Sequence, residues 1–164
     1  MPNQNWSRLT HLQLGQYGEY YAKMEFTSYG FDVYTSEVDD HGVDFVARHP
    51  ITGAYYEVQV KSARGYSYVY AQKSKLPLSP THLFCYLRFA DGALPEVYVI
   101  PSTVWLTPNE TFVSRDFQKA GQTSRPEWGI NVSGKNLVKL APYHAERYLP
   151  LLLEGTEAEV AKES

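Results

Sequence analysis

The chain has 164 residues, of which 43% are hydrophobic and 20% charged, and this length predicts a single domain over 1–153 with a disordered acidic tail over 154–164. No apolar run approaches the roughly 18 residues of a membrane span, and the polar first residues lack the apolar core of a secretion signal, so we expect a cytoplasmic protein with no membrane partner. The single cysteine, Cys85, excludes an intramolecular disulfide and a cysteine-based metal site, and the net charge of −3 is a weak argument against a protein that only coats nucleic acid.

The first predicted element is a helix over 10–29. Leu14, Tyr17, Tyr21 and Met24 recur with helical spacing. A second stripe of small residues, 15, 18 and 22, predicts close packing of this helix against a sheet. Gly30 then ends the helix.

Strand patterns follow in quick succession. The longest covers 54–63, and shorter ones cover 31–34, 43–47, 83–87, 97–100 and 128–132. A short helix is expected at 101–105 and a longer one at 142–153. Apart from the strand at 128–132, residues 107–134 are expected to be loop. This order predicts an α/β protein with a mixed central β-sheet flanked by helices.

Charge is distributed unevenly along this order of elements. Residues 1–57 contain three basic and eight acidic side chains, whereas residues 58–90 contain five basic side chains and no acidic one. Carboxylates collect metal cations, and Lys and Arg neutralise phosphodiesters, so the two blocks suit a metal-dependent enzyme that acts on nucleic acid. Chance clustering of solvated charges is the alternative explanation.

Chemically active side chains gather on neighbouring predicted elements. Glu57, Gln59 and Lys61 share one face of the longest strand, because strand side chains alternate with period two. Asp44 lies at the start of the strand one hairpin away, and Glu19 lies on the preceding helix. Carboxylate and amide oxygens suit Mg²⁺, and a lysine can orient a water for phosphodiester hydrolysis. The alternative is that Glu57 and Lys61 form an ordinary surface ion pair.

These residues also carry a family resemblance. Gly42-Val43-Asp44-Phe45, followed by Glu57-Val58-Gln59-Val60-Lys61-Ser62, resembles the core of the PD-(D/E)XK nucleases. The helix with Gly15-Gln16-Tyr17-Gly18-Glu19 is similar to that of the Holliday junction resolvases in this superfamily. The resemblance covers about residues 10–64.

The resemblance implies a restriction-endonuclease-like core of the αβββαβ type and a DNA endonuclease that uses Mg²⁺ or Mn²⁺. It implies that Asp44 and position 59 hold the metal, that Lys61 serves the attacking water, and that Glu19 reaches the metal from the helix. It also implies a homodimer, with contacts expected from 66–70 or 97–105.

Position 59 departs from the usual pattern, because the acid expected there is Gln59. A Gln-x-Lys variant occurs in some methylation-dependent restriction endonucleases. The substitution removes a negative charge from the metal site, and Glu57 on the same face is a candidate to compensate. Two alternatives stay open: an inactive nuclease fold that binds nucleic acid or protein, and a small assembly protein that associates through its tyrosines.

Basic and polar residues after the motif are candidate nucleic-acid contacts. They are Arg64, Gln72, Lys73 and Lys75, and solvated side chains are the alternative explanation for them. The tyrosines at 66, 68 and 70 have the chemistry to stack on unpaired bases, but packing within the protein is the commoner role of such residues.

Overall fold

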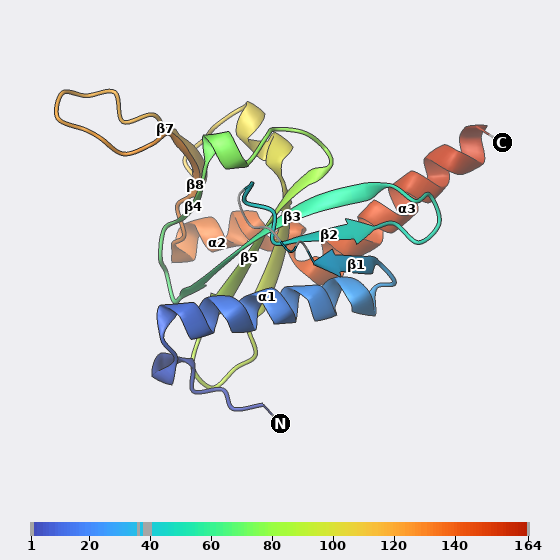
Figure 1. Ribbon diagram of the computed structural model, residues 1–164, viewed down its shortest axis with the longest axis horizontal. Helices are drawn as coiled ribbons and strands as arrows, with labels where there is room; N and C mark the ends of the chain where they lie inside the picture. Colours follow the sequence, from blue (N-terminus) through green and yellow to red (C-terminus); the bar gives the residue numbers. More distant parts are fainter. Residues whose placement is uncertain (1, 36, 38–40, 164) are drawn as a thin grey trace.

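The structure is a computed structural model that describes residues 2–35, 37 and 41–163, with side chains described as far as Gly155. Its centre is a five-stranded sheet in the order β1-β2-β3-β5-β6 (Figure 1). The strands are β1 (Asp32–Thr35), β2 (Phe45–Arg48), β3 (Tyr55–Arg64), β5 (His82–Phe89) and β6 (Glu96–Pro101). Only the β3–β5 pair of this described sheet is parallel, so the sheet is mixed as the sequence predicts.

A smaller antiparallel sheet lies beside the first. It contains β4 (Val69–Gln72), β7 (Phe112–Arg115) and β8 (Glu127–Ile130), in the order β4-β8-β7. The helices are α1 (His11–Ser28), α2 (Gly134–Leu140) and α3 (Ala145–Glu163). Four 3₁₀ turns complete the described chain: η1 (Trp6–Arg8), η2 (Lys73–Lys75), η3 (Ser102–Leu106) and η4 (Ala141–Tyr143).

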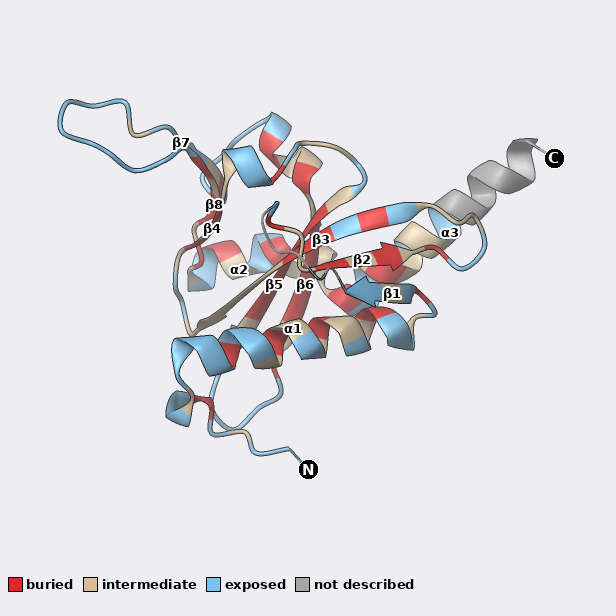
Figure 2. Cartoon of the chain, viewed as in Figure 1, coloured by how far each residue is buried: buried red, intermediate tan, exposed pale blue. Residues whose placement is uncertain are grey.

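The two faces of the central sheet bury two separate cores. On β5, Leu83, Cys85 and Leu87 pack with α1 and α3, whereas Phe84 and Tyr86 pack with the smaller sheet, η3 and α2. This split follows from the alternation of side chains along a strand. Figure 2 shows the same arrangement as buried stripes on the central strands and on the inward side of α1. Within the described chain, no helix is long and apolar enough to cross a membrane.

Helix α1 covers the central sheet where the sequence predicts it. A reciprocal pair of hydrogen bonds between Thr10 and Gln13 begins it, and Gly30 follows its end with a φ of +97°. Gly18 is buried against β3, and a Cβ there would lie 1.9 Å from Oγ of Ser62. The expectation was wrong for Gly15, which has open space around it, and for Met24, which is 58% exposed.

Other boundaries also differ from expectation. The chain crosses from β3 to the parallel strand β5 through β4 and η2, with no α-helix in that connection. Strand β7 lies within 107–134, where only the strand at 128–132 was expected, and helix α2 covers 134–140, for which no element was predicted. The last helix begins at Ala145 and extends past 153. The tail expected over 154–164 falls largely on residues whose side chains lie outside the described part, so its disorder stays a prediction.

Candidate active site

A cavity of about 630 Å³ opens where the loop before β2, strand β3 and the segment around β4 meet. The first turn of α1 forms another part of its wall through His11 and Leu14. Of the residues selected from the sequence, the cavity brings together Asp44, Gln59, Lys61, Arg64, Gln72 and Lys75. It does not include Glu57, Glu19 or Lys73.

Asp44 is tied to β3 through both its main chain and its side chain. Its backbone N–H donates to the carbonyl of Val58 at 2.9 Å. Its Oδ2 accepts a hydrogen bond of 2.6 Å from the backbone N–H of Val60. The carboxylate is therefore held at the peptide that links Gln59 to Val60, one residue before Lys61.

Gln59, one of the residues that line this cavity, carries an unsatisfied polar atom. The side chain is 8% exposed, and its Oε1 is buried without a hydrogen-bond partner among the described residues. Leaving such an acceptor unpaired costs free energy, typically about 1–3 kcal/mol. An amide oxygen beside a carboxylate is a donor set that fits a hard divalent cation, which would satisfy this oxygen.

Lys61 lies two residues further along the same face of β3 and is half-buried in the cavity wall. The charged side chains of the lining are mostly basic, because Arg64 and Lys75 join Lys61, and Asp44 is the one carboxylate among the described lining residues. A wall with three cations and one anion suits a polyanionic ligand.

Two carboxylates expected near the metal have other partners. Glu57 lies directly opposite His82 in the β3–β5 pair, and its Oε2 lies 2.6 Å from Nε2 of His82. Glu19 pairs with Lys23 one turn along α1, with 3.2 Å between the charged atoms. No group of three or more His, Cys, Asp or Glu able to hold a metal occurs in the described part of the chain. The turn Asp39-Asp40-His41 that precedes Gly42 in the sequence offers a further candidate ligand, but Asp39 and Asp40 lie outside the described residues.

The expected nucleic-acid contacts separate into two groups. Gln72 and Lys75 line the cavity, and Oε1 of Gln72 is buried without a hydrogen-bond partner in the described structure. Arg64 lines it too, but its guanidinium donates to the carbonyls of Trp6 and Leu9, which fixes the chain before α1. Lys73 points elsewhere, toward β7 and β8.

Two tyrosines, for which packing was the expected role, form an aromatic side of the cavity. Tyr68 and Tyr70 line it, with rings stacked at a centroid distance of 5.8 Å. Burial, followed by its hydrogen bond to Glu127, raises the pKa of Tyr68 far above the usual range for a tyrosine. Tyr66 lies apart, beneath the guanidinium of Arg88.

Gly42 is a further residue of the site whose role was not apparent in the sequence. Its φ is +78°, and a Cβ there would lie 2.9 Å from Cβ of Lys75. Glycine therefore permits both the turn that leads to Asp44 and the close approach of Lys75. The sequence signal for this role is its place two residues before the aspartate.

Comparison with known proteins identifies the fold. No protein-family model matches the chain, and no curated protein matches it. Among solved structures, a bacterial homing endonuclease superposes with a TM-score of 0.57 at 16% identity, over 93% of this chain and 98% of that one. A Holliday junction resolvase from Archaeoglobus fulgidus gives a TM-score of 0.45 at 12% identity, over 71% and 83% of the two chains. The chain has the restriction-endonuclease-like fold.

Proposed function

We propose that this protein is a metal-dependent endonuclease that hydrolyses phosphodiester bonds in DNA. The observation that carries the proposal is the placement of Asp44, Gln59 and Lys61 in one cavity, with the Asp44 carboxylate bonded to the β3 main chain between them. The similarity to a homing endonuclease supports the fold, and the basic lining of the cavity supports a nucleic-acid substrate.

In this proposal, Asp44 and Gln59 would hold Mg²⁺ or Mn²⁺ through their side-chain oxygens. The bound cation would polarise the scissile phosphate and lower the pKa of a coordinated water. Asp44 supplies the negative charge, and its hydrogen bond to Val60 fixes the carboxylate. Gln59 supplies a neutral ligand, so we expect weaker metal binding than with two carboxylates.

Lys61 would orient the attacking water. Its ammonium group donates hydrogen bonds and stabilises the negative charge that develops on the phosphoryl oxygens. Lys75 would neutralise a neighbouring phosphate of the bound strand, and the unpaired oxygen of Gln72 is an acceptor for a donor on the substrate. Arg64 is assigned no phosphate, because its guanidinium donates to the carbonyls of Trp6 and Leu9. Lys73 is assigned no contact in the cavity, because its ammonium group is bonded to Asp116 and Ser114.

A metal role for Glu57 or Glu19 would require an exchange of partners. Each carboxylate would have to leave the basic side chain that it now contacts, His82 or Lys23. Glu57→Gln and Glu19→Gln test this requirement. If the carboxylates only form these ion pairs, both variants keep their affinity for Mn²⁺, whereas a ligand role predicts a clear loss.

An inactive nuclease fold that binds nucleic acid is the second candidate. Gln59, together with a single carboxylate in the described cavity lining, favours it. Calorimetric titration with Mn²⁺ separates the two functions. The nuclease binds the metal with heat that Asp44→Ala removes and also nicks supercoiled plasmid. The binding module shows neither this heat nor nicking.

We also propose that two copies act together, since cutting both strands of a duplex requires two active sites or two successive events. The surface expected at 97–105 is mostly buried within one chain, including Tyr98, Ile100 and Trp105. Tyr66 and Tyr70 are exposed and offer the better surface. Sedimentation with and without duplex DNA tests this: the proposal predicts a dimer on DNA, and a monomer in both samples contradicts it.

A further inference from the structure

A long connection between β7 and β8 extends away from the body of the protein. We call residues 116–126 the arm; Figure 1 shows it as the orange segment beyond the β7 label. Every residue of 118–126 is exposed, and Phe117 is half-buried (Figure 2). The arm is longer than most connections between secondary-structure elements, which are about 4–6 residues long.

The arm has the chemistry of a nucleic-acid contact. Residues 117–126 contain Lys119 and Arg125 and no acidic residue, although the whole chain has a net charge of −3. The acidic residue at the base, Asp116, is neutralised by Lys73, with 2.6 Å between Nζ and Oδ1. Gln118 and Gln122 add side chains that both donate and accept hydrogen bonds.

The base of the arm is fixed to the rest of the molecule. Lys73 also donates to Oγ of Ser114 at 2.7 Å and lies 4.1 Å from the centre of the Trp128 ring. At the next position of β7, the guanidinium of Arg115 lies 4.1 Å from the centre of the Tyr68 ring. These contacts hold β7 and β8, the two strands between which the arm lies, at the base of the arm.

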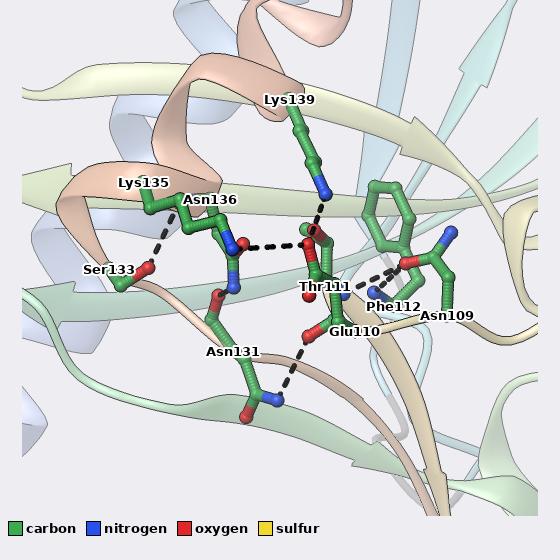
Figure 3. A network of polar contacts seen from close by, with 9 residues as sticks. All are labelled: Asn109, Glu110, Thr111, Phe112, Asn131, Ser133, Lys135, Asn136 and Lys139. Carbon is green, nitrogen blue, oxygen red and sulfur yellow. Dashed lines mark hydrogen bonds and ion pairs between the residues drawn. The ribbon is translucent and has the colours of Figure 1, made fainter.

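A second network holds the other end of β7 and β8, as Figure 3 shows. Asn131 donates from Nδ2 to the carbonyl of Glu110 at 3.1 Å, and Asn136 on α2 donates to the carbonyl of Asn131 at 2.9 Å. Lys139 on α2 contacts the carboxylate of Glu110. The two strands are thus held at both ends, so the positions at which the arm begins and ends are fixed.

Tyr68 connects the arm to the cavity. Its hydroxyl donates to Oε2 of Glu127, the first residue of β8, at 2.6 Å, and its ring lines the cavity. The ring crosses β8 at Gly129, where a Cβ would lie 2.0 Å from the hydroxyl oxygen. The base of the arm and the cavity therefore share a wall.

We propose that the arm enters the major groove of duplex DNA while one strand of that duplex lies in the cavity. This inference rests on the proposed function. The major groove of B-form DNA is about 12 Å wide and admits a two-stranded β-ribbon. The arm is the loop at the end of such a ribbon: it joins the paired strands β7 and β8 and has no strand structure of its own. Lys119 and Arg125 contact phosphates at the edges of the groove, and Gln118 and Gln122 read base edges, most favourably those of adenine.

The first test measures binding without cleavage. The affinity of the full-length protein for a mixed-sequence DNA duplex is determined by anisotropy in chelator over a range of salt concentrations. Replacing Lys119 and Arg125 by Ser makes the slope of log affinity against log salt shallower by about 1.8, since each lost phosphate contact removes about 0.9. Arg147→Ser with Lys135→Ser removes two exposed cations from α3 and α2, and this matched control leaves the slope within 0.5 of wild type, roughly half of one contact.

The second test measures base reading. Cleavage or binding selection from a randomised duplex library gives a sequence preference for wild type, which Gln118→Ala with Gln122→Ala weakens by about tenfold or more at the positions read. An RNA duplex of the same sequence is insensitive to the arm variants, because the major groove of A-form RNA is too deep and narrow to admit them.

The outcomes separate the arm from the proposed function. If the protein binds duplex DNA through the arm but cleaves none of the substrates, the proposal for the arm is supported and the proposed endonuclease activity is wrong. If wild type cleaves DNA, and the arm variants keep the salt dependence and the sequence preference of wild type, the proposal for the arm is wrong and the endonuclease stands. Equal loss of RNA duplex affinity in the arm variants also overturns insertion into the groove. A wild-type protein that neither binds nor cuts a duplex overturns both.

Discussion

The side chain of Asp44 accepts a hydrogen bond of 2.6 Å from the backbone N–H of Val60. This bond joins the loop before β2 to the middle of β3, at the residue between Gln59 and Lys61. This carboxylate has a structural role, as the acceptor of the bond from Val60, and a role in the proposed chemistry, as a metal ligand. The first role needs only an oxygen atom, whereas the second needs the negative charge.

Asp44→Asn and Asp44→Ala separate the two roles. Asn retains an oxygen that can accept from Val60, so we expect a free energy of unfolding close to that of wild type. Ala leaves this half-buried N–H unpaired, which typically costs about 1–3 kcal/mol. Urea denaturation measures the difference, and nicking assays are expected to show both variants inactive. Equal stability of the two variants would contradict the structural role of the bond.

Gln59→Glu tests whether position 59 faces a metal. The new carboxylate is buried beside Asp44, so without metal we expect repulsion between like charges and a lower melting temperature. With Mg²⁺ or Mn²⁺ the same carboxylate becomes a charged ligand, and the melting temperature should rise more steeply with metal concentration than in wild type. Scanning calorimetry at several metal concentrations gives both quantities. A melting temperature of the variant that does not change with metal concentration would argue against a ligand role for this position.

Gly18→Ala and Gly15→Ala form a matched pair on α1. A Cβ at Gly18 meets Ser62 at 1.9 Å, whereas Gly15 has no neighbour within 4 Å. We expect Gly15→Ala to stabilise the protein by roughly 0.5–1 kcal/mol through helix propensity. Gly18→Ala should destabilise it by about 1–3 kcal/mol through overpacking.

Ser62→Ala provides the control for this pair. It removes the crowded hydroxyl, which has no hydrogen-bond partner among the described residues. The cost of Gly18→Ala should therefore be smaller in the Ser62→Ala background, as a double-mutant cycle by urea unfolding would show. Strict additivity of the two substitutions would mean that they do not touch.

Local sequence patterns predicted the parts of this fold that depend on local rules. The alternation over 54–63 identified β3 and placed Gln59 and Lys61 on one face, and the spacing to Asp44 placed that residue in the same cavity. The capping residues Thr10 and Gly30 bracket α1 because both act within a single turn of the chain.

The failures come from contacts between distant segments. Glu57 turns to His82 because the parallel pairing of β3 with β5 sets these residues side by side, and no local pattern shows that register. Strand β7 is four residues long and is held by its pairing with β8. Met24 continues the helical spacing of apolar residues but is exposed, because the buried side of α1 is formed by Leu14, Gly18, Ala22 and Phe26 and Met24 lies on the opposite side of the helix.

Glu25 should make a contribution to stability that falls as pH rises through the weakly acidic range. Burial, followed by the nearby charge of Glu146, raises the pKa of Glu25 above its ordinary value of 4.5. An acid with a raised folded-state pKa contributes its stability below the unfolded value, and this contribution is lost as pH rises through the folded value.

Glu25→Gln should remove this dependence and be more stable than wild type near pH 7. Glu146→Gln should reduce it only in part, since burial of Glu25 remains. Urea unfolding at a series of pH values between about 4 and 8 measures the profiles. If the free energy of unfolding changes with pH in the same way for wild type and Glu25→Gln, the Glu25 carboxyl is not the source of the pH dependence.

The measurement that tests the central claim most directly is cleavage of a panel of nucleic acids with Mg²⁺ or Mn²⁺ by wild type and Lys61→Ala. The panel contains supercoiled plasmid, linear duplex, a four-way junction and single-stranded DNA, and circular dichroism confirms that both proteins are folded. We predict metal-dependent cleavage of DNA by wild type and a loss of about 10²-fold or more in Lys61→Ala. Equal cleavage by the two proteins, or no cleavage of any substrate by folded wild type, would contradict the endonuclease.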